Sequence, residues 1–180
     1  PHMAAEASES FSEVVRELAR EHLVAAIGEA GLDFHRDLSP RAAQETLFEQ
    51  QLALAAALEM PVFAHERDAS ERFTAILQQW RDHIPAIIVH CFTGSQATLD
   101  AYLDLDCHIG ITGWICDERR GHHLLESIDR VPHDRLMVET DAPYLLPRDL
   151  KPRPKSRRNE PAYLPHIVAR LAAVRGEAPE

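Results

Sequence analysis

The chain has 180 residues, 45% of them hydrophobic, which is enough for a single domain over residues 1–180 with a buried core. Its formal net charge of −10 argues against a general coat for nucleic acid but leaves room for a local nucleic-acid site. We expect no membrane span and no secretory signal, because the sequence has no long apolar run. Three cysteines without a CxxC pair favour a reduced, cytoplasmic protein over a disulfide framework or a zinc ribbon.

The predicted elements begin with an amphipathic helix over residues 6–22, where Phe11, Val14 and Leu18 recur at helical spacing. Five short apolar runs follow, and each is succeeded by a helical pattern. We predict strands at 23–28, 61–65, 86–90, 107–111 and 135–139, and helices at 40–59, 68–82, 95–103, 117–129 and 160–175.

Strict alternation of strand and helix predicts an α/β fold with parallel strands. Two architectures satisfy it: an open doubly wound sheet, and part of an eight-stranded barrel, which typically needs about 250 residues. Ser39 and Asp117 are the expected N-caps of the helices that follow them, and Gly176 is expected to close the last helix. Residues 31–37 are predicted to form a loop.

Four side chains that commonly bind metals stand at, or just past, the ends of predicted strands. They are Glu29, His65, His90 and Asp141. The carboxyl ends of parallel strands meet at one face, so we expect these groups to converge. Two imidazoles and two carboxylates suit Mg²⁺, Mn²⁺ or Zn²⁺, and a shared carboxylate such as Glu29 can bridge two ions about 3.5–4 Å apart. The pattern therefore predicts a hydrolytic centre with one or two divalent ions.

Two further carboxylates lie near these ligands in the sequence. Glu139 stands two residues before Asp141, so we expect the two to share one strand face, with one binding metal and the other orienting a neighbour. Asp33 falls in the predicted loop after Glu29, where an aspartate more often forms a turn than reaches a site.

One segment is strongly basic. Residues 148–158 carry six Lys or Arg and one Asp, a net +5, and Pro152 and Pro154 exclude a regular helix. Because the segment begins seven residues after Asp141, we expect a loop near the same strand ends that holds phosphates; a solvated charged loop is the alternative. Trp114, just past a predicted strand, is either a stacking platform for a base or a packing residue.

Five motifs resemble those of the TatD family of metal-dependent deoxyribonucleases. Residues 28–33 resemble GE-x-GLD, 65–69 resemble H-x-RDA, 90–94 resemble HCF-S/T-G, 139–144 resemble ETDAPY and 158–161 resemble RNEP. The resemblance extends from the first predicted helix to the last. Five motifs in the same order and spacing make it specific.

The resemblance implies a (β/α)8 TIM barrel of about 260 residues, from which this chain would lack the N-terminal strands and the last C-terminal helix. It implies metal ligation by Glu29, His65, His90 and Asp141, with Glu29 and Asp141 also catalytic. Mg²⁺ is the expected cation, with Mn²⁺ or Zn²⁺ as alternatives. The implied reaction is 3′→5′ exonucleolytic hydrolysis of single-stranded DNA, with RNA as a further substrate, and we expect a monomer. The expected substrate-binding residues are His2, Arg67, Trp114, Arg153, Lys155, Arg157 and Arg158.

Several readings stay open at this point. Pro1-His2 matches the end of the family's GVHPH segment, with a cloning remnant as the alternative, and the H-x-H pair that many relatives carry on their first strand is absent. An amidohydrolase-type ester or amide hydrolase, such as a D-aminoacyl-tRNA deacylase, would use the same metal ligands without needing the basic segment. A third reading is an incomplete barrel that serves only as an interaction module.

Overall fold

Strand and helix alternate along the chain in the computed structural model, which describes residues 1–179. The chain packs as two units. Unit 1 comprises residues 1–90 and 101–108, and unit 2 comprises residues 91–100 and 109 onward. Within each unit the strands run parallel to their neighbours, which confirms the predicted parallel α/β class.

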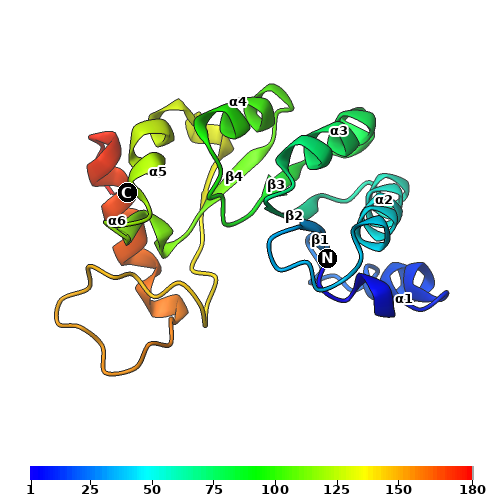
Figure 1. The fold of residues 1–180 in the computed structure, drawn as a ribbon, viewed down its shortest axis with the longest axis horizontal. Helices are drawn as coiled ribbons and strands as arrows, with labels where there is room; N and C mark the ends of the chain where they lie inside the picture. Colours follow the sequence, from blue (N-terminus) through cyan, green and yellow to red (C-terminus); the bar gives the residue numbers. More distant parts are fainter. Residues whose placement is uncertain (180) are drawn as a thin grey trace. The chain divides into compact units, whose positions relative to one another are not determined.

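Unit 1 contains three strands, three helices and two 3₁₀ turns. They are a 3₁₀ turn at Ala4–Glu6, α1 (Phe11–Leu18), β1 (Ile27–Asp33), α2 (Arg41–Leu58), β2 (Val62–Arg67), α3 (Ser70–Trp80), a 3₁₀ turn at Arg81–His83 and β3 (Ile87–Val89). The strands pair in chain order, β1 with β2 and β2 with β3, and the N-terminus lies beside β1 (Figure 1).

Aromatic side chains fill the space between the helices and strands of unit 1. The rings of Phe48 on α2 and Phe73 on α3 stack with centroids 5.1 Å apart, and Tyr102 packs edge-on against Phe73 at 5.6 Å. All three side chains are fully buried, and the Tyr102 hydroxyl donates a 2.9 Å hydrogen bond to the Glu66 carboxylate. Burial of these large apolar surfaces stabilises the helix layer against β2, the strand that carries His65.

Strand β1 contains one extra residue relative to β2. Gly28 pairs with Phe63 and Ala30 pairs with Ala64, so Glu29 is a bulge in the ladder. After the bulge the register is regular, and Gly31 lies opposite His65. Bulges of this kind bend a strand and redirect a side chain, and they are frequent next to active sites.

Unit 2 contains two paired strands, and a long loop separates β5 from α6. Its elements are a 3₁₀ turn at Gly113–Cys116, α5 (His122–Ser127), 3₁₀ turns at Ile128–Arg130, His133–Arg135 and Pro161–Tyr163, β5 (Leu136–Val138) and α6 (Leu164–Arg175). Strand β4 (His108–Ile111) and helix α4 (Gln96–Asp104) each have residues in both units. The loop is drawn in yellow and orange in Figure 1, and it contains the basic segment 148–158.

Two predicted boundaries near the N-terminus were wrong. The strand predicted at 23–28 is observed as β1 at Ile27–Asp33, because the ladder with β2 continues through Asp33. Consequently the loop predicted at 31–37 starts later. The helix predicted over 6–22 is a 3₁₀ turn followed by the shorter α1, with Ser8 and Ser10 hydrogen-bonded to each other between the two.

Two predicted N-caps were also wrong. The Ser39 hydroxyl donates to the backbone carbonyl of His2 at 2.9 Å, so it fastens the N-terminal segment and does not cap α2. The Asp117 carboxylate accepts from the backbone N–H of Arg119 and from the Arg120 side chain, which closes a turn, and α5 begins only at His122. The predicted closure of the last helix is confirmed, because Gly176 ends α6 in the left-handed conformation.

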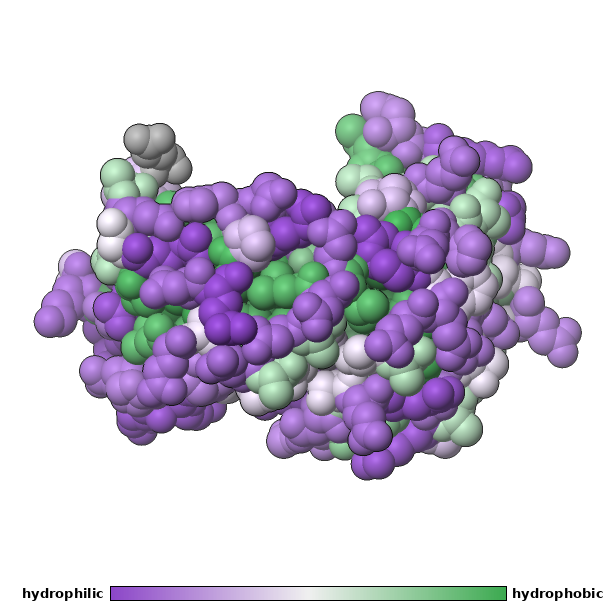
Figure 2. Space-filling view, turned by 90° about the horizontal axis from the view of Figure 1, so that it is seen from above, coloured by the Kyte–Doolittle hydropathy of each residue, from purple (hydrophilic) through white to green (hydrophobic). Residues whose placement is uncertain are grey.

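Figure 2 shows one face on which hydrophilic side chains predominate and apolar side chains appear in patches between them. Some large apolar side chains of unit 1 are exposed, among them Val14 and Leu18 on α1. In residues 1–179, no helix combines the length and the apolar character needed to cross a bilayer.

Gly31 offers a test of the β1–β2 packing. Its φ of 137° lies where residues with a side chain are strained, and an added Cβ would overlap the carbonyl oxygen of His65. We expect Gly31→Ala to lower the free energy of unfolding by about 3 kcal/mol or more. Gly176→Ala is the control, because Gly176 also has a positive φ but open space around it, and it should cost about 1 kcal/mol. If urea unfolding shows that both variants lose the same unfolding free energy, the close packing of Gly31 against His65 is contradicted.

Candidate metal centre

Three of the four predicted metal ligands meet in unit 1. Oε1 of Glu29 lies 2.8 Å from Nδ1 of His65 and 3.2 Å from Nε2 of His90. The two imidazole nitrogens are 3.1 Å apart. Donor atoms each bound about 2.1 Å from one cation lie roughly 3–3.5 Å from each other, so this spacing suits a shared divalent ion. Whether these three residues bind a metal stays a prediction.

The strands fix these three side chains. Glu29 projects from the bulge in β1, and His65 lies within β2 opposite Gly31, which has no side chain to block its approach. His90 follows β3 directly, and its backbone N–H continues the ladder by donating to Ala64 at 2.9 Å. The ring of Phe63 stacks on the His90 imidazole with centroids 4.8 Å apart. Neighbouring parallel strands therefore deliver the three side chains to one place.

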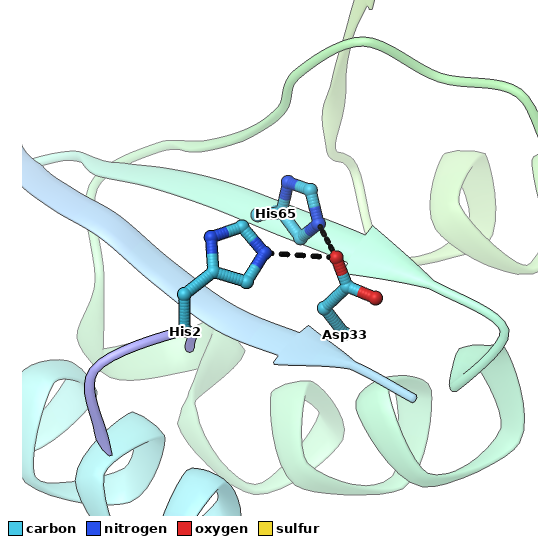
Figure 3. Close-up of side chains that lie close together, drawn as sticks. All are labelled: His2, Asp33 and His65. Carbon is cyan, nitrogen blue, oxygen red and sulfur yellow. Dashed lines mark hydrogen bonds and ion pairs between the residues drawn. The ribbon is translucent and has the colours of Figure 1, made fainter. Parts of the chain in front are cut away.

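Asp33 extends this cluster, and its two carboxylate oxygens have different partners. Oδ1 accepts from the backbone N–H groups of Arg36 at 2.7 Å and His35 at 3.1 Å, the turn expected from the sequence. Oδ2 lies 2.9 Å from Nε2 of His2 and 3.2 Å from Nε2 of His65 (Figure 3). The carboxylate is 1% exposed, so Asp33 both forms the turn and holds the far side of the His65 ring.

Both carboxylates are stabilised in the ionised form. Contacts with the imidazoles of His65 and His90 hold the pKa of Glu29 well below its usual range, against the opposing effect of burial. Burial also raises the pKa of Asp33, but the Arg36 N–H, His2 and His65 outweigh it and lower the pKa to about 2. Two anionic groups therefore flank His65 at neutral pH, a charge arrangement that favours a cation.

Two predicted substrate-binding residues lie beside this cluster in unit 1. His2 contacts Asp33, and Nη1 of Arg36 lies 3.1 Å from its Nε2. Arg67 ends β2, pairs with Asp33 in the strand register and accepts a backbone hydrogen bond from Phe34. The positions of His2 and Arg67 are compatible with substrate contact, which stays a prediction for both.

Asp141, the fourth predicted ligand, belongs to unit 2. Strand β5 ends at Val138, and Asp141 has a φ of 54°, so the strand alternation is broken before it. The expectation that Glu139 and Asp141 share one strand face was therefore wrong. The Glu139 carboxylate instead accepts the backbone N–H of Cys91, and the Glu139 N–H donates to Ile111 at 3.0 Å.

Asn159 holds the segment that carries Asp141, a role that the sequence did not reveal. This residue is 1% exposed, and its side-chain amide donates to the Thr140 carbonyl at 2.7 Å. Its backbone N–H donates to the Pro143 carbonyl at 3.0 Å. The only sequence signal was the RNEP motif itself. In the structure that motif fastens the ETDAPY segment on both sides of Asp141.

The basic segment of unit 2 helps to form a pocket of about 530 Å³. Its walls are formed by the 3₁₀ turn at 113–116, the start of the following turn and the loop before α6. The charged and aromatic residues in these walls are Trp114, Asp117, Arg119, Arg120, Arg148, Arg153 and Arg157. Five arginines and one aspartate give the pocket a strongly positive lining.

Four of the five arginines of this pocket form two groups. Arg120 and Arg148 are paired with the buried Asp117, at 2.9 Å and 3.7 Å, and the Arg120 guanidinium covers one face of the Trp114 ring at 4.5 Å. In contrast, Arg153 and Arg157 are exposed and form no ion pair within residues 1–179. They therefore remain available to a phosphate. Lys155 and Arg158 are exposed as well but do not line the pocket.

Comparison with known proteins connects these features to one family. The family model described as TatD related DNase matches residues 1–180. A Klebsiella pneumoniae protein named 3'-5' ssDNA/RNA exonuclease TatD is 58% identical over 177 residues, which are 98% of this chain and 67% of the relative. A protein of the same name from Yersinia pseudotuberculosis is 57% identical over 179 residues, 99% of this chain and 69% of the relative.

Solved structures share the fold. The crystal structure of YJJV, a TatD homologue from Escherichia coli K12, superposes with a TM-score of 0.86 at 27% identity, covering 98% of this chain and 67% of that chain. A TatD family hydrolase from Entamoeba histolytica also gives a TM-score of 0.86, at 24% identity, covering 99% of this chain and 67% of that chain. These matches confirm the predicted fold, part of a TatD-like barrel.

The low pKa of Asp33 predicts a pH dependence of stability. A carboxyl group whose pKa falls from 3.8 to about 2 on folding contributes stability above pH 3.8, and this contribution is lost as the pH falls towards 2. Between pH 4 and pH 2 we expect wild type to lose about 2 kcal/mol more unfolding free energy than Asp33→Asn. Asp104→Asn, an exposed site with the same charge change, is the control. If the unfolding free energies of wild type and Asp33→Asn change in parallel between pH 4 and pH 2, the pKa of Asp33 is not lowered on folding.

Proposed function

Because the chain belongs to the TatD-related DNase family, we propose that it is a metal-dependent nuclease that hydrolyses single-stranded DNA and RNA from the 3′ end. The observation that carries this proposal is the cluster of three donor atoms on Glu29, His65 and His90, at mutual distances of 2.8–3.2 Å. The names of the relatives supply the substrate class.

The tautomer of His65, meaning which of its ring nitrogens carries the proton, favours a cation between these donors. Asp33 only accepts hydrogen bonds, so Nε2 of His65 carries the proton that it shares with Asp33. Nδ1 of a neutral His65 then directs a lone pair towards the anionic Glu29, 2.8 Å away. That contact is repulsive unless a proton or a cation lies between the two atoms. We infer that Glu29, His65 and His90 hold a divalent ion, with Mg²⁺ expected and Mn²⁺ or Zn²⁺ as alternatives.

The chain's own residues have separate tasks in this proposal. When bound, the metal would supply an activated water and neutralise charge on the phosphoryl oxygens. Asp33 keeps His65 in the required tautomer and orientation. Glu29 is 42% exposed at its side chain, so the centre is open to a substrate phosphate. Asp141 stays the fourth ligand that its sequence motif predicts, and Asn159 positions the segment on which Asp141 lies.

The pocket of unit 2 supplies phosphate contacts. Arg153 and Arg157 have no ion-pair partner within residues 1–179, and a volume of about 530 Å³ lies in the range of small-ligand sites. With Arg120 on one face of Trp114, a base would stack on the opposite face. The alternatives of a D-aminoacyl-tRNA deacylase and an inert interaction module have no comparable support. A cytoplasmic location and a monomeric state stay predictions.

Asp141→Asn tests the role of Asp141. Asn is nearly isosteric but lacks the charge that would hold the cation, so we expect kcat to fall by about 1,000-fold or more on a single-stranded oligonucleotide. The unfolding free energy should change little. Asp129→Asn, an exposed site in the same unit, is the control. If Asp141→Asn hydrolyses the oligonucleotide at the wild-type rate in saturating Mg²⁺, Asp141 is not a ligand of the catalytic metal.

Neutralising Arg153 and Arg157 tests the basic pocket. The double variant Arg153→Gln/Arg157→Gln should bind an oligonucleotide more weakly, and its log–log salt slope should fall by about 1.4, because each phosphate contact to a single strand contributes about 0.7. The double variant Arg16→Gln/Arg20→Gln changes the net charge equally at exposed sites of unit 1. If both double variants show the same slope, the pocket does not contact phosphate.

A further inference from the structure

A second group of potential metal ligands lies in unit 2 and shares no residue with the Glu29 cluster. It consists of Cys116 at the end of the 3₁₀ turn 113–116, Asp149 in the loop before α6, and His166 in the first turn of α6. One ligand atom from each lies within 4.8 Å of the other two. Nε2 of His166 and Oδ1 of Asp149 are 2.7 Å apart.

The burial of the three groups differs in a way that suits a metal site. Cys116 is 3% exposed, so its sulfur lies at the inner side of the cluster. The side chains of Asp149 and His166 are 40% and 33% exposed, so a cation can reach the cluster from solvent and keep a water as a fourth ligand. A tetrahedral zinc ion holds sulfur and nitrogen donors roughly 3.5 Å apart, which small side-chain rotations would achieve here.

Cysteine, histidine and aspartate also occur together in nucleophilic sites, but this arrangement does not fit one. A nucleophilic cysteine needs a thiol that a substrate can reach. Cys116 is only 3% exposed, and its ligand atom lies within 4.8 Å of those of Asp149 and His166. A single metal ion fits among these three groups, and it would displace the thiol proton directly.

We propose that Cys116, Asp149 and His166 form a second divalent-cation site that takes Zn²⁺ in preference to Mg²⁺ and fixes the base of the basic loop. A thiolate and an imidazole are ligands that zinc prefers, whereas Mg²⁺ prefers oxygen ligands and retains its waters. The three ligands come from three separate segments, so one ion ties them together. Asp149 directly follows Arg148, and Cys116 directly precedes Asp117, and both of these neighbours line the basic pocket.

Cobalt substitution tests this site, because Co²⁺ bound to a thiolate gives a sulfur-to-metal charge-transfer band in the near ultraviolet that oxygen and nitrogen ligands do not give. Titration of the reduced, metal-free chain with Co²⁺ should produce this band, saturating at one ion per chain, and Zn²⁺ should abolish it. Cys116→Ser should lack the band. His166→Asn, at a position whose side chain is partly exposed, should weaken cobalt binding at least tenfold.

Three controls separate this site from the Glu29 cluster and from the other cysteines. Cys107→Ser and Cys91→Ser remove the remaining thiols, and His90→Ala disables the proposed catalytic centre; all three variants should retain the band. Absence of the band in wild type, or its persistence in Cys116→Ser, overturns the proposal. Loss of nuclease activity in His90→Ala with the band intact shows that the two sites are independent.

Limited proteolysis tests the effect on the loop. Trypsin can cleave the exposed basic segment after Lys155, Arg157 and Arg158. Zn²⁺ should slow this cleavage several-fold in wild type and in Cys107→Ser, but not in Cys116→Ser. Equal cleavage rates with and without Zn²⁺ in wild type would refute the role of the site in fixing the loop.

Discussion

The pairing of β1 with β2 is the constraint on which the candidate centre depends. Opposite the bare backbone of Gly31, His65 lies between Glu29 and Asp33, and each of its ring nitrogens reaches a different carboxylate. The bulge at Glu29 and the missing side chain at Gly31 permit these contacts. A register slip of one residue would turn the β1 side chains to the other face, which would separate both carboxylates from His65. His90 joins the cluster because β3 continues the same ladder.

Charge is distributed unevenly in this acidic protein. Anionic groups flank His65 in unit 1, where they favour a cation, and the exposed Arg153 and Arg157 lie in one loop of unit 2. A polyanionic substrate needs both kinds of site, since the reacting phosphoryl group requires a cation and the rest of the strand requires local positive charge. The pairing of Asp117 with Arg120 and Arg148 fixes part of the basic pocket, and Arg153 and Arg157 remain free for phosphates within the described chain.

Sequence reasoning found the alternation of strands and helices, because apolar runs mark buried strands whatever surrounds them. It also predicted that Glu29, His65 and His90 converge, and three of their donor atoms do meet. The predicted placement at strand ends holds only for His90, because β1 and β2 continue past Glu29 and His65. It favoured a turn role over a site role for Asp33, because glycine at position 31 resembled a loop, and only pairing with β2 shows that the strand continues. The bulge at Glu29 depends on a partner strand more than 30 residues away and leaves no local signal. The hydrogen bond from Asn159 to the Thr140 carbonyl is likewise a tertiary contact, so it leaves no local signal in the sequence.

The central claim is that a divalent cation binds between Glu29, His65 and His90. Crystals grown with Mn²⁺ test it most directly, because anomalous scattering distinguishes manganese from water and from lighter ions. The account predicts an anomalous peak within about 2.0–2.3 Å of Oε1 of Glu29, Nδ1 of His65 and Nε2 of His90. A fully occupied manganese peak at another place, with no peak between these three atoms, would contradict the account.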